Sequence, residues 1–110
     1  MTYPVLIMFE KTAQIFGVII DELDDDKCDF YDAMSIMYMA DLQSILETSY
    51  PILRYQDCSM RLIDFDDYFE FSEPDDLSMS DVKLVKDPGV GQLSPYEIDT
   101  IKDKVDEYYA

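Results

Sequence analysis

The 110-residue chain is the size of one domain and carries 25 acidic against 8 basic residues, a net charge of −17 at pH 7. Apolar residues make up 48% and aromatic residues 14% of it, which excludes an unstructured acidic tail, because disordered chains are poor in aromatic side chains. Such a charge repels nucleic acids and anionic membranes and attracts basic surfaces. We therefore expect a single acidic globular domain over residues 1–110 that binds neither nucleic acid nor membrane directly.

The two cysteines, Cys28 and Cys58, lack the CxxC spacing of zinc and redox sites. We expect both thiols to pack in the core of a protein of the reducing cytoplasm, which is the host cytoplasm if a phage encodes the chain. The first residues, MTYPVLIMFEK, have no basic region and are interrupted by Glu10 and Lys11. They predict neither a signal peptide nor a membrane span.

The first predicted element is a helix, because apolar residues recur at helical spacing through 5–23. Thr2 suits its N-cap and Pro4 its first turn. Gly17 weakens this helix by about 1 kcal/mol. A short strand over residues 3–9 is the alternative.

A second apolar stripe at helical spacing predicts a helix over 28–49, ended by Pro51. Asp25 or Asp26 can cap its start, because a carboxylate accepts hydrogen bonds from the free N–H groups of the first turn.

The next segment, 52–71, fits two structures. Its apolar residues alternate at spacings of three and four, which favours a helix, whereas LIDF and YFEF on either side of Asp66 and Asp67 also suit a β-hairpin. Residues 72–93 contain Pro74, Pro88, Gly89 and Gly91 and predict a loop, with a short extended piece at 82–85.

The last segment begins with SPYE, a capping box in which Ser94 caps, Pro95 takes the first turn and Glu97 reaches back. The helix that follows has one apolar face, which can pack inward or against a second copy: Ile98, Ile101, Val105 and Tyr108. The whole pattern predicts a mainly α fold, a compact bundle of three or four helices with an irregular or short β connection around 60–93. The alternative is an α+β fold with a small hairpin at 60–72.

Catalytic and metal sites are not predicted. The chain has no histidine, the commonest general base and metal ligand, and no phosphate-binding loop. An EF-hand calcium loop beginning at Asp24 or Asp64 is not predicted, because positions 5 and 6 of either loop carry the wrong residues. We therefore expect no cofactor, no dedicated metal and no enzymatic activity.

The informative feature is a pair of acidic runs, DELDDDKCDFYD at 21–32 and LIDFDDYFEFSEPDD at 62–76. Residues 21–76 hold 17 acids against 3 bases, a net charge of −14. Acids at the C-terminal ends of the first and last predicted helices interact unfavourably with the helix dipole. The row Asp99–Asp103–Glu107 places like charges four residues apart, as does Asp66–Glu70 if that segment is helical. Solubility is the simpler explanation, but this stability cost favours a docking surface.

Acids four apart on a helix are about 5–6 Å apart, comparable with phosphates along a DNA strand, and aromatic neighbours can anchor an interface. We predict that the partner is a basic protein surface bound by the following residues: Asp21, Glu22, Asp24, Asp25, Asp26, Asp29, Tyr31, Asp32, Asp64, Asp66, Asp67, Tyr68, Glu70, Glu73, Asp75 and Asp76. Of the phenylalanines in the second run, we expect Phe65 and Phe69 in the core.

In charge and length the chain resembles the DNA-mimic inhibitors that phages and mobile elements carry against restriction and CRISPR systems. The resemblance implies an anti-CRISPR or anti-restriction protein that blocks the nucleic-acid cleft of a host enzyme without catalysis. Three alternatives remain: an immunity protein against a basic nuclease toxin, an enzyme using carboxylates and Mg²⁺, and a regulatory module. The last would bind, for example, RNA polymerase through apolar contacts, to which the methionine-rich stretch 34–39 contributes.

Overall fold

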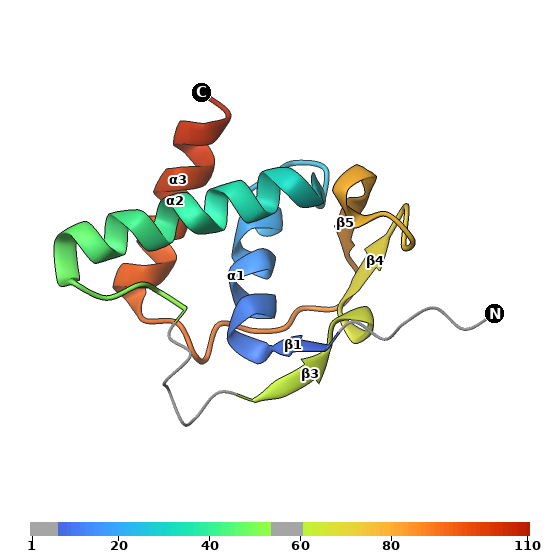
Figure 1. Cartoon of the computed structure of the whole chain (residues 1–110), viewed down its shortest axis with the longest axis horizontal. Coiled ribbons are helices and arrows are strands. Elements are labelled where there is room, and N and C mark those ends of the chain that lie inside the picture. The colour runs from blue at the N-terminus through green and yellow to red at the C-terminus, as the bar shows by residue number, and fades with distance from the viewer. Residues whose placement is uncertain (1–6, 54–60) are drawn as a thin grey trace.

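The computed structural model describes residues 7–53 and 61–110. Within these two ranges, three helices, two 3₁₀ turns and five strands follow one another (Figure 1): β1 (Ile7–Phe9), α1 (Glu10–Asp21), β2 (Lys27–Asp29), α2 (Phe30–Thr48), β3 (Leu62–Asp64), η1 (Phe65–Asp67), β4 (Phe69–Phe71), η2 (Leu77–Met79), β5 (Asp81–Leu84) and α3 (Pro95–Tyr108).

α1 is the central element of the fold. Every residue from Lys11 to Ile20 is buried, so the helix has no solvent-facing side. Helices of this kind occur in cores that enclose them completely, and here α2, α3 and the sheets surround α1 (Figure 1). At its centre the Phe16 ring meets the edges of Phe30, Phe65 and Phe69 at centroid distances of 5.9, 5.4 and 6.3 Å.

The strands form two small antiparallel sheets. β1 pairs with β3, and β5 lies between β2 and β4. In the three-stranded sheet Val82 stands opposite both Cys28 and Phe71, and this row faces the core. The next row, on the opposite face because side chains alternate along a strand, is exposed and polar: Lys27, Lys83 and Glu70.

The predicted helix bundle is therefore wrong, because the described residues form an α+β fold with two antiparallel sheets. The alternative had the right class but the wrong pairing: β3 and β4 form no hairpin with each other and pair with β1 and β5. Strands of three or four residues are too short to show a period of two, and their partners are distant in sequence.

The predicted helix over 52–71 is also wrong within the described residues. Its described part contains β3, η1 and β4 instead. The spacing of three and four arises because the chain turns at η1, which brings Phe65 and Phe69 to the same side, with stacked rings 4.3 Å apart.

The first helix begins later than predicted, and the second has a different N-cap. α1 begins at Glu10, behind β1, which lies within the alternative strand; the predicted cap Thr2 is outside the described residues. α2 is capped by Asp29, whose Oδ1 accepts from the Asp32 N–H at 3.2 Å. Asp25 and Asp26 are too early, because β2 intervenes.

The end of the chain follows the prediction. Ser94 and Glu97 form the capping box of α3, and Ile101 and Val105 are buried. Ile98 and Tyr108 are partly buried against the same core, so this face packs inward. β5 confirms the extended piece, and Cys28 is a buried thiol; Cys58 lies outside the described residues.

Candidate functional site

The fold brings the two acidic runs to the same sheet. β2 belongs to the run 21–32 and β4 to the run 62–76, and both are hydrogen-bonded to β5. Both runs also contact the end of β5, because the Leu84 N–H donates to the Asp26 carbonyl at 3.1 Å and the Val85 N–H to the Tyr68 carbonyl at 2.9 Å. The runs are therefore neighbours on one surface, which we call the acidic surface.

Most acids of the acidic surface point to solvent without a cation. Eleven of its fourteen acids are exposed, and within the described residues only Glu22 has an ion pair, with Lys102 Nζ 3.9 Å from its Oε1. The exposed acids are Asp21, Glu22, Asp24, Asp25, Asp26, Asp66, Asp67, Glu70, Glu73, Asp75 and Asp76. At Asp66, burial first and then the charges of Asp64 and Asp67 raise the pKa of the carboxyl group.

Lysines interrupt the acidic surface, a feature that the sequence alone does not predict. Lys83 on β5 stands between Lys27 and Glu70 in the exposed row of the sheet. Beside it, Lys86 Nζ lies 5.3 Å from the centre of the Tyr68 ring, within reach of a cation–π contact. The two runs are thus two negative patches on either side of a basic strip. Only the strand order shows this, because the sequence predicts an extended piece at 82–85 but not the strands that lie on either side of it.

Four predicted site acids have structural roles instead. Asp29 caps α2, and the Oδ1 of Asp64 accepts from the Asp66 N–H at 3.0 Å at the start of η1. Asp76 accepts from Ser78 at 2.5 Å. Asp32 accepts at 2.6 Å from a tyrosine of α3. These carboxylates contribute charge but are held by the fold.

The Asp32 contact belongs to a small polar cluster that joins the end of α3 to the start of α2. Tyr108 and Tyr109 donate to the two carboxylate oxygens of Asp32 at 2.6 and 3.4 Å. The Tyr109 hydroxyl also lies 3.3 Å from Cys28 Sγ. The hydrogen bond to Asp32 raises the pKa of Tyr108, and burial raises those of Tyr109 and Cys28. A thiol with a raised pKa stays protonated at neutral pH, so Cys28 is a packing residue and a poor nucleophile.

The aromatic residues of the runs are mostly core. Phe65 and Phe69 are buried, as predicted. Phe71 and Tyr68 are partly buried against the same core. Only Tyr31, which is 65% exposed on the first turn of α2, is free to serve as an interface anchor.

One of the two predicted rows of like charges exists. Asp99, Asp103 and Glu107 are exposed along α3, where Glu107 pairs with Lys104 at 2.9 Å. The Asp66–Glu70 row is wrong, because η1 and β4 replace the helix.

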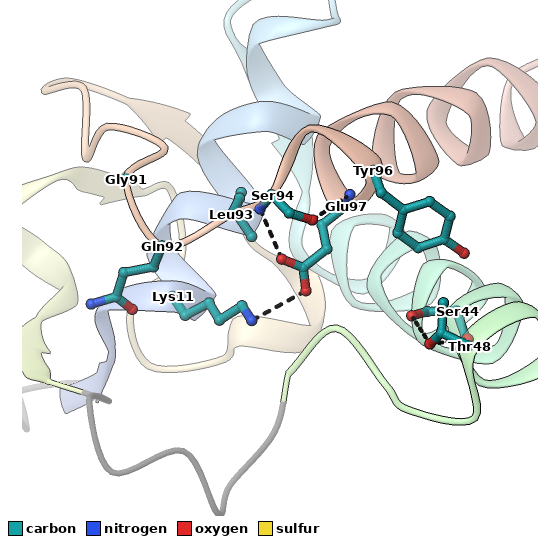
Figure 2. A pocket seen from close by; sticks show the side chains of 9 residues that line it. All are labelled: Lys11, Ser44, Thr48, Gly91, Gln92, Leu93, Ser94, Tyr96 and Glu97. Carbon is teal, nitrogen blue, oxygen red and sulfur yellow. Dashed lines mark hydrogen bonds and ion pairs between the residues drawn. The ribbon is translucent and has the colours of Figure 1, made fainter.

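A separate hollow of about 470 Å³ opens between α1, α2 and the start of α3 (Figure 2). At its wall the Lys11 ammonium lies 3.2 Å from Glu97 Oε2, and the side chains are only 7% and 11% exposed. Glu97 is also held by the capping box, because its Oε1 accepts from the Ser94 N–H at 2.9 Å. The pair therefore joins the buried helix α1 to the first turn of α3.

The other polar side chains of the hollow are also engaged within the chain. Ser44 donates to the Tyr50 carbonyl at 2.7 Å, and Thr48 to the Ser44 carbonyl at 2.8 Å. Gln92 and Tyr96 donate to Glu10 and Glu47, both at 2.9 Å. The hydrogen bonds from Gln43 and Tyr96 lower the pKa of Glu47. A site whose polar groups already have partners has little affinity left for a ligand, so we assign the hollow a structural role.

Within residues 7–53 and 61–110, no three His, Cys, Asp or Glu side chains are placed to hold a metal ion together. In the same ranges no helix has the length and apolar character needed to cross a bilayer.

Comparison of the chain with protein-family models, with curated proteins and with solved structures found no match.

Proposed function

We propose that the protein is a non-catalytic inhibitor whose acidic surface occupies the basic nucleic-acid-binding cleft of a DNA- or RNA-processing protein in the cytoplasm. The observation that carries the proposal is the exposure of eleven acids in the two neighbouring runs, which make a single ion pair, of 3.9 Å, within the described part of the chain. Such a surface fits best a DNA-mimic inhibitor of a host defence system.

Electrostatics supports this type of partner over a solubility role. A few units of net charge keep a small domain soluble, whereas this chain carries −17. Concentrated negative charge speeds encounter with a basic cleft and repels nucleic acid itself. The basic strip with Lys83 adds a further requirement: the cleft must present acids or backbone carbonyls between two positive regions.

Two features support inhibition by binding alone. The hollow between α1 and α3 has its polar groups engaged internally, and the buried thiol of Cys28 has a raised pKa. Neither offers an activated nucleophile or base.

The test is a pull-down from a bacterial lysate with matched charge variants. In the site variant, Asp24, Asp25 and Asp26 become asparagine; in the control, Asp99, Asp103 and Asp106 on α3 become asparagine. Both remove three exposed charges, so net charge is the same in each. We expect the wild type and control to retain a nucleic-acid-binding protein, which excess duplex DNA or salt releases, and the site variant to retain much less.

The proposal fails if the two variants behave alike, because the effect then comes from net charge. It also fails if the captured partner resists both DNA and salt.

A further inference from the structure

α2 has an apolar outer face as well as a buried inner face. Ala33, Ile36, Met37 and Ala40 are buried on the inner side. The outer stripe, at helical spacing, consists of Tyr31, Tyr38, Leu42, Ile45 and Leu46, which are 65%, 62%, 59%, 44% and 74% exposed. Single exposed apolar residues are normal on a protein surface, but a contiguous stripe marks an interaction site.

The stripe borders an apolar groove. A depression of about 290 Å³ lies between α2 and the β1–β3 sheet, lined on the helix side by Met34, Met37 and Tyr38. Ile7 and Leu62, 59% and 61% exposed, line the strand side. Pockets for small ligands hold about 300–1,000 Å³, so this groove suits one or two large apolar side chains. We call the groove and the α2 stripe together the apolar face.

The charges around the apolar face are negative. α2 contains Asp32, Asp41 and Glu47 and no lysine or arginine. Among the described residues that line the groove, Asp41 is the one with a charged side chain, and its Oδ1 accepts from the Ile52 and Leu53 N–H groups at 2.9 and 3.3 Å. Arg61 adjoins Leu62, and its guanidinium lies 3.8 Å from Glu10 Oε2. The face is therefore apolar at its centre and acidic along the helix that builds it.

We infer that the apolar face binds an amphipathic helix of a partner protein whose apolar side is flanked by lysine and arginine. One or two large side chains of that helix fill the groove, others cover Leu42 and Leu46, and its basic flanks meet the carboxylates of α2. Charge complementarity selects this occupant over a second copy, which would bring the same −17 net charge and the same helix without bases. The face shares Tyr31 and Leu62 with the two acidic runs, but Leu42 and Leu46, which the test below changes, lie outside both runs, so this inference does not depend on the proposed function.

The test uses a fluorescent 14-residue peptide of leucine and lysine arranged with helical periodicity, and measures its Kd by anisotropy on the full chain. The stripe variant carries L42Q and L46Q; the control carries V85Q and V90Q, exposed apolar residues outside the apolar face at 51% and 46%. All four are exposed, so both variants should fold, which circular dichroism checks. We expect the stripe variant to bind at least tenfold more weakly and the control to match the wild type.

Two further arms separate apolar docking from general attraction to an acidic protein. A peptide of the same composition with its leucines scattered around the helix should bind at least tenfold more weakly than the patterned one. The D24N/D25N/D26N variant should keep most of its affinity for the patterned peptide, whatever the outcome of the pull-down.

The inference is overturned if the patterned and scattered peptides bind equally, or if L42Q with L46Q leaves Kd unchanged. It is also overturned if sedimentation equilibrium shows a dimer of the wild type that these two substitutions dissociate, because a second copy is then the occupant.

Discussion

Gly17 lets α1 pack closely against the segment at Pro88, because glycine has no side chain between them. A Cβ at this position would lie 2.9 Å from Pro88 Cγ and 3.2 Å from its Cδ, in the connection that crosses α1. We expect G17A to destabilise the protein by about 1–3 kcal/mol through overpacking, although alanine favours a helix by about 1 kcal/mol. Urea unfolding measures this. G91A, with nothing within 4 Å of its Cβ, is the control and should change stability by less than about 0.5 kcal/mol; equal effects would contradict the contact.

The Lys11–Glu97 pair has a second measurable consequence. K11M fills the same space but leaves the Glu97 carboxylate, which is 11% exposed, without its cation. We expect a loss of about 3 kcal/mol in the free energy of unfolding, because a buried charge is left uncompensated. K102M removes the surface pair with Glu22, where the lysine is 47% exposed, and should cost less than about 1 kcal/mol. Similar losses in both variants would show that the buried pair matters no more for stability than the surface pair.

Asp41 makes stability depend on pH in an unusual direction. Burial raises the pKa of this carboxyl group more than the Ile52 and Leu53 N–H groups lower it. The folded state therefore binds a proton more readily than the unfolded state, and the contribution of Asp41 to stability falls as pH rises above its ordinary value near 4. D41N keeps an acceptor oxygen for both N–H groups and has no proton to lose. We expect the stability of D41N relative to wild type to increase from pH 4 to pH 7 in urea unfolding; a decrease would contradict the burial effect.

At the scale of the element, the C-terminus of α2 carries a correctable strain. Ser49 follows the helix with φ +72°, in the left-handed region that costs a non-glycine residue about 1–2 kcal/mol. We expect S49G to stabilise the protein by about 0.5–1 kcal/mol, because glycine adopts this conformation freely. Thermal unfolding measures the gain, with S35G inside the same helix as the opposite control, expected to destabilise by a similar amount. A loss of stability in S49G would contradict the cap geometry.

Helices and strands of this protein differ in how far sequence predicts them. The capping box at Ser94 and the apolar stripe of α2 are local signals, and both helices exist. The strands pair over long separations: Ile7 with Asp64, and Lys27 with Lys83. No local pattern encodes such pairings, so the sheets and the true neighbours of the acidic runs were not predictable.

The candidate site shows the same division. Exposure of Asp24, Asp25 and Asp26 follows from composition. The basic strip through Lys83 depends on strand order. The burial of Phe65 and Phe69 was predicted, but the stacking of their rings depends on the turn at η1. Sequence predicts charge and exposure, whereas the arrangement of charges requires the fold.

At the scale of the whole molecule, the net charge of −17 opposes folding. Exposed acids repel one another over distances of about 10 Å at 0.1 M salt, and added salt screens this repulsion. We expect 0.3 M NaCl to raise Tm by about 5 °C relative to 0.02 M NaCl, which corresponds to roughly 1 kcal/mol for a domain of this size. The D24N/D25N/D26N variant should show a smaller rise. A fall in Tm with salt would mean that attractive pairs dominate.

The complete burial of α1 also bears on how the chain folds. α1 lies near the beginning of the chain but packs against α3 at its end, and the Lys11–Glu97 pair spans 86 residues. Such distant contacts slow folding, because the intervening chain must be ordered before they form. The core can close only after α3 has been synthesised, so α1 is not fully shielded from water until residues 95–108 have left the ribosome. A protein truncated before Ser94 would therefore leave one side of its central helix exposed, which makes it a target for proteolysis and aggregation.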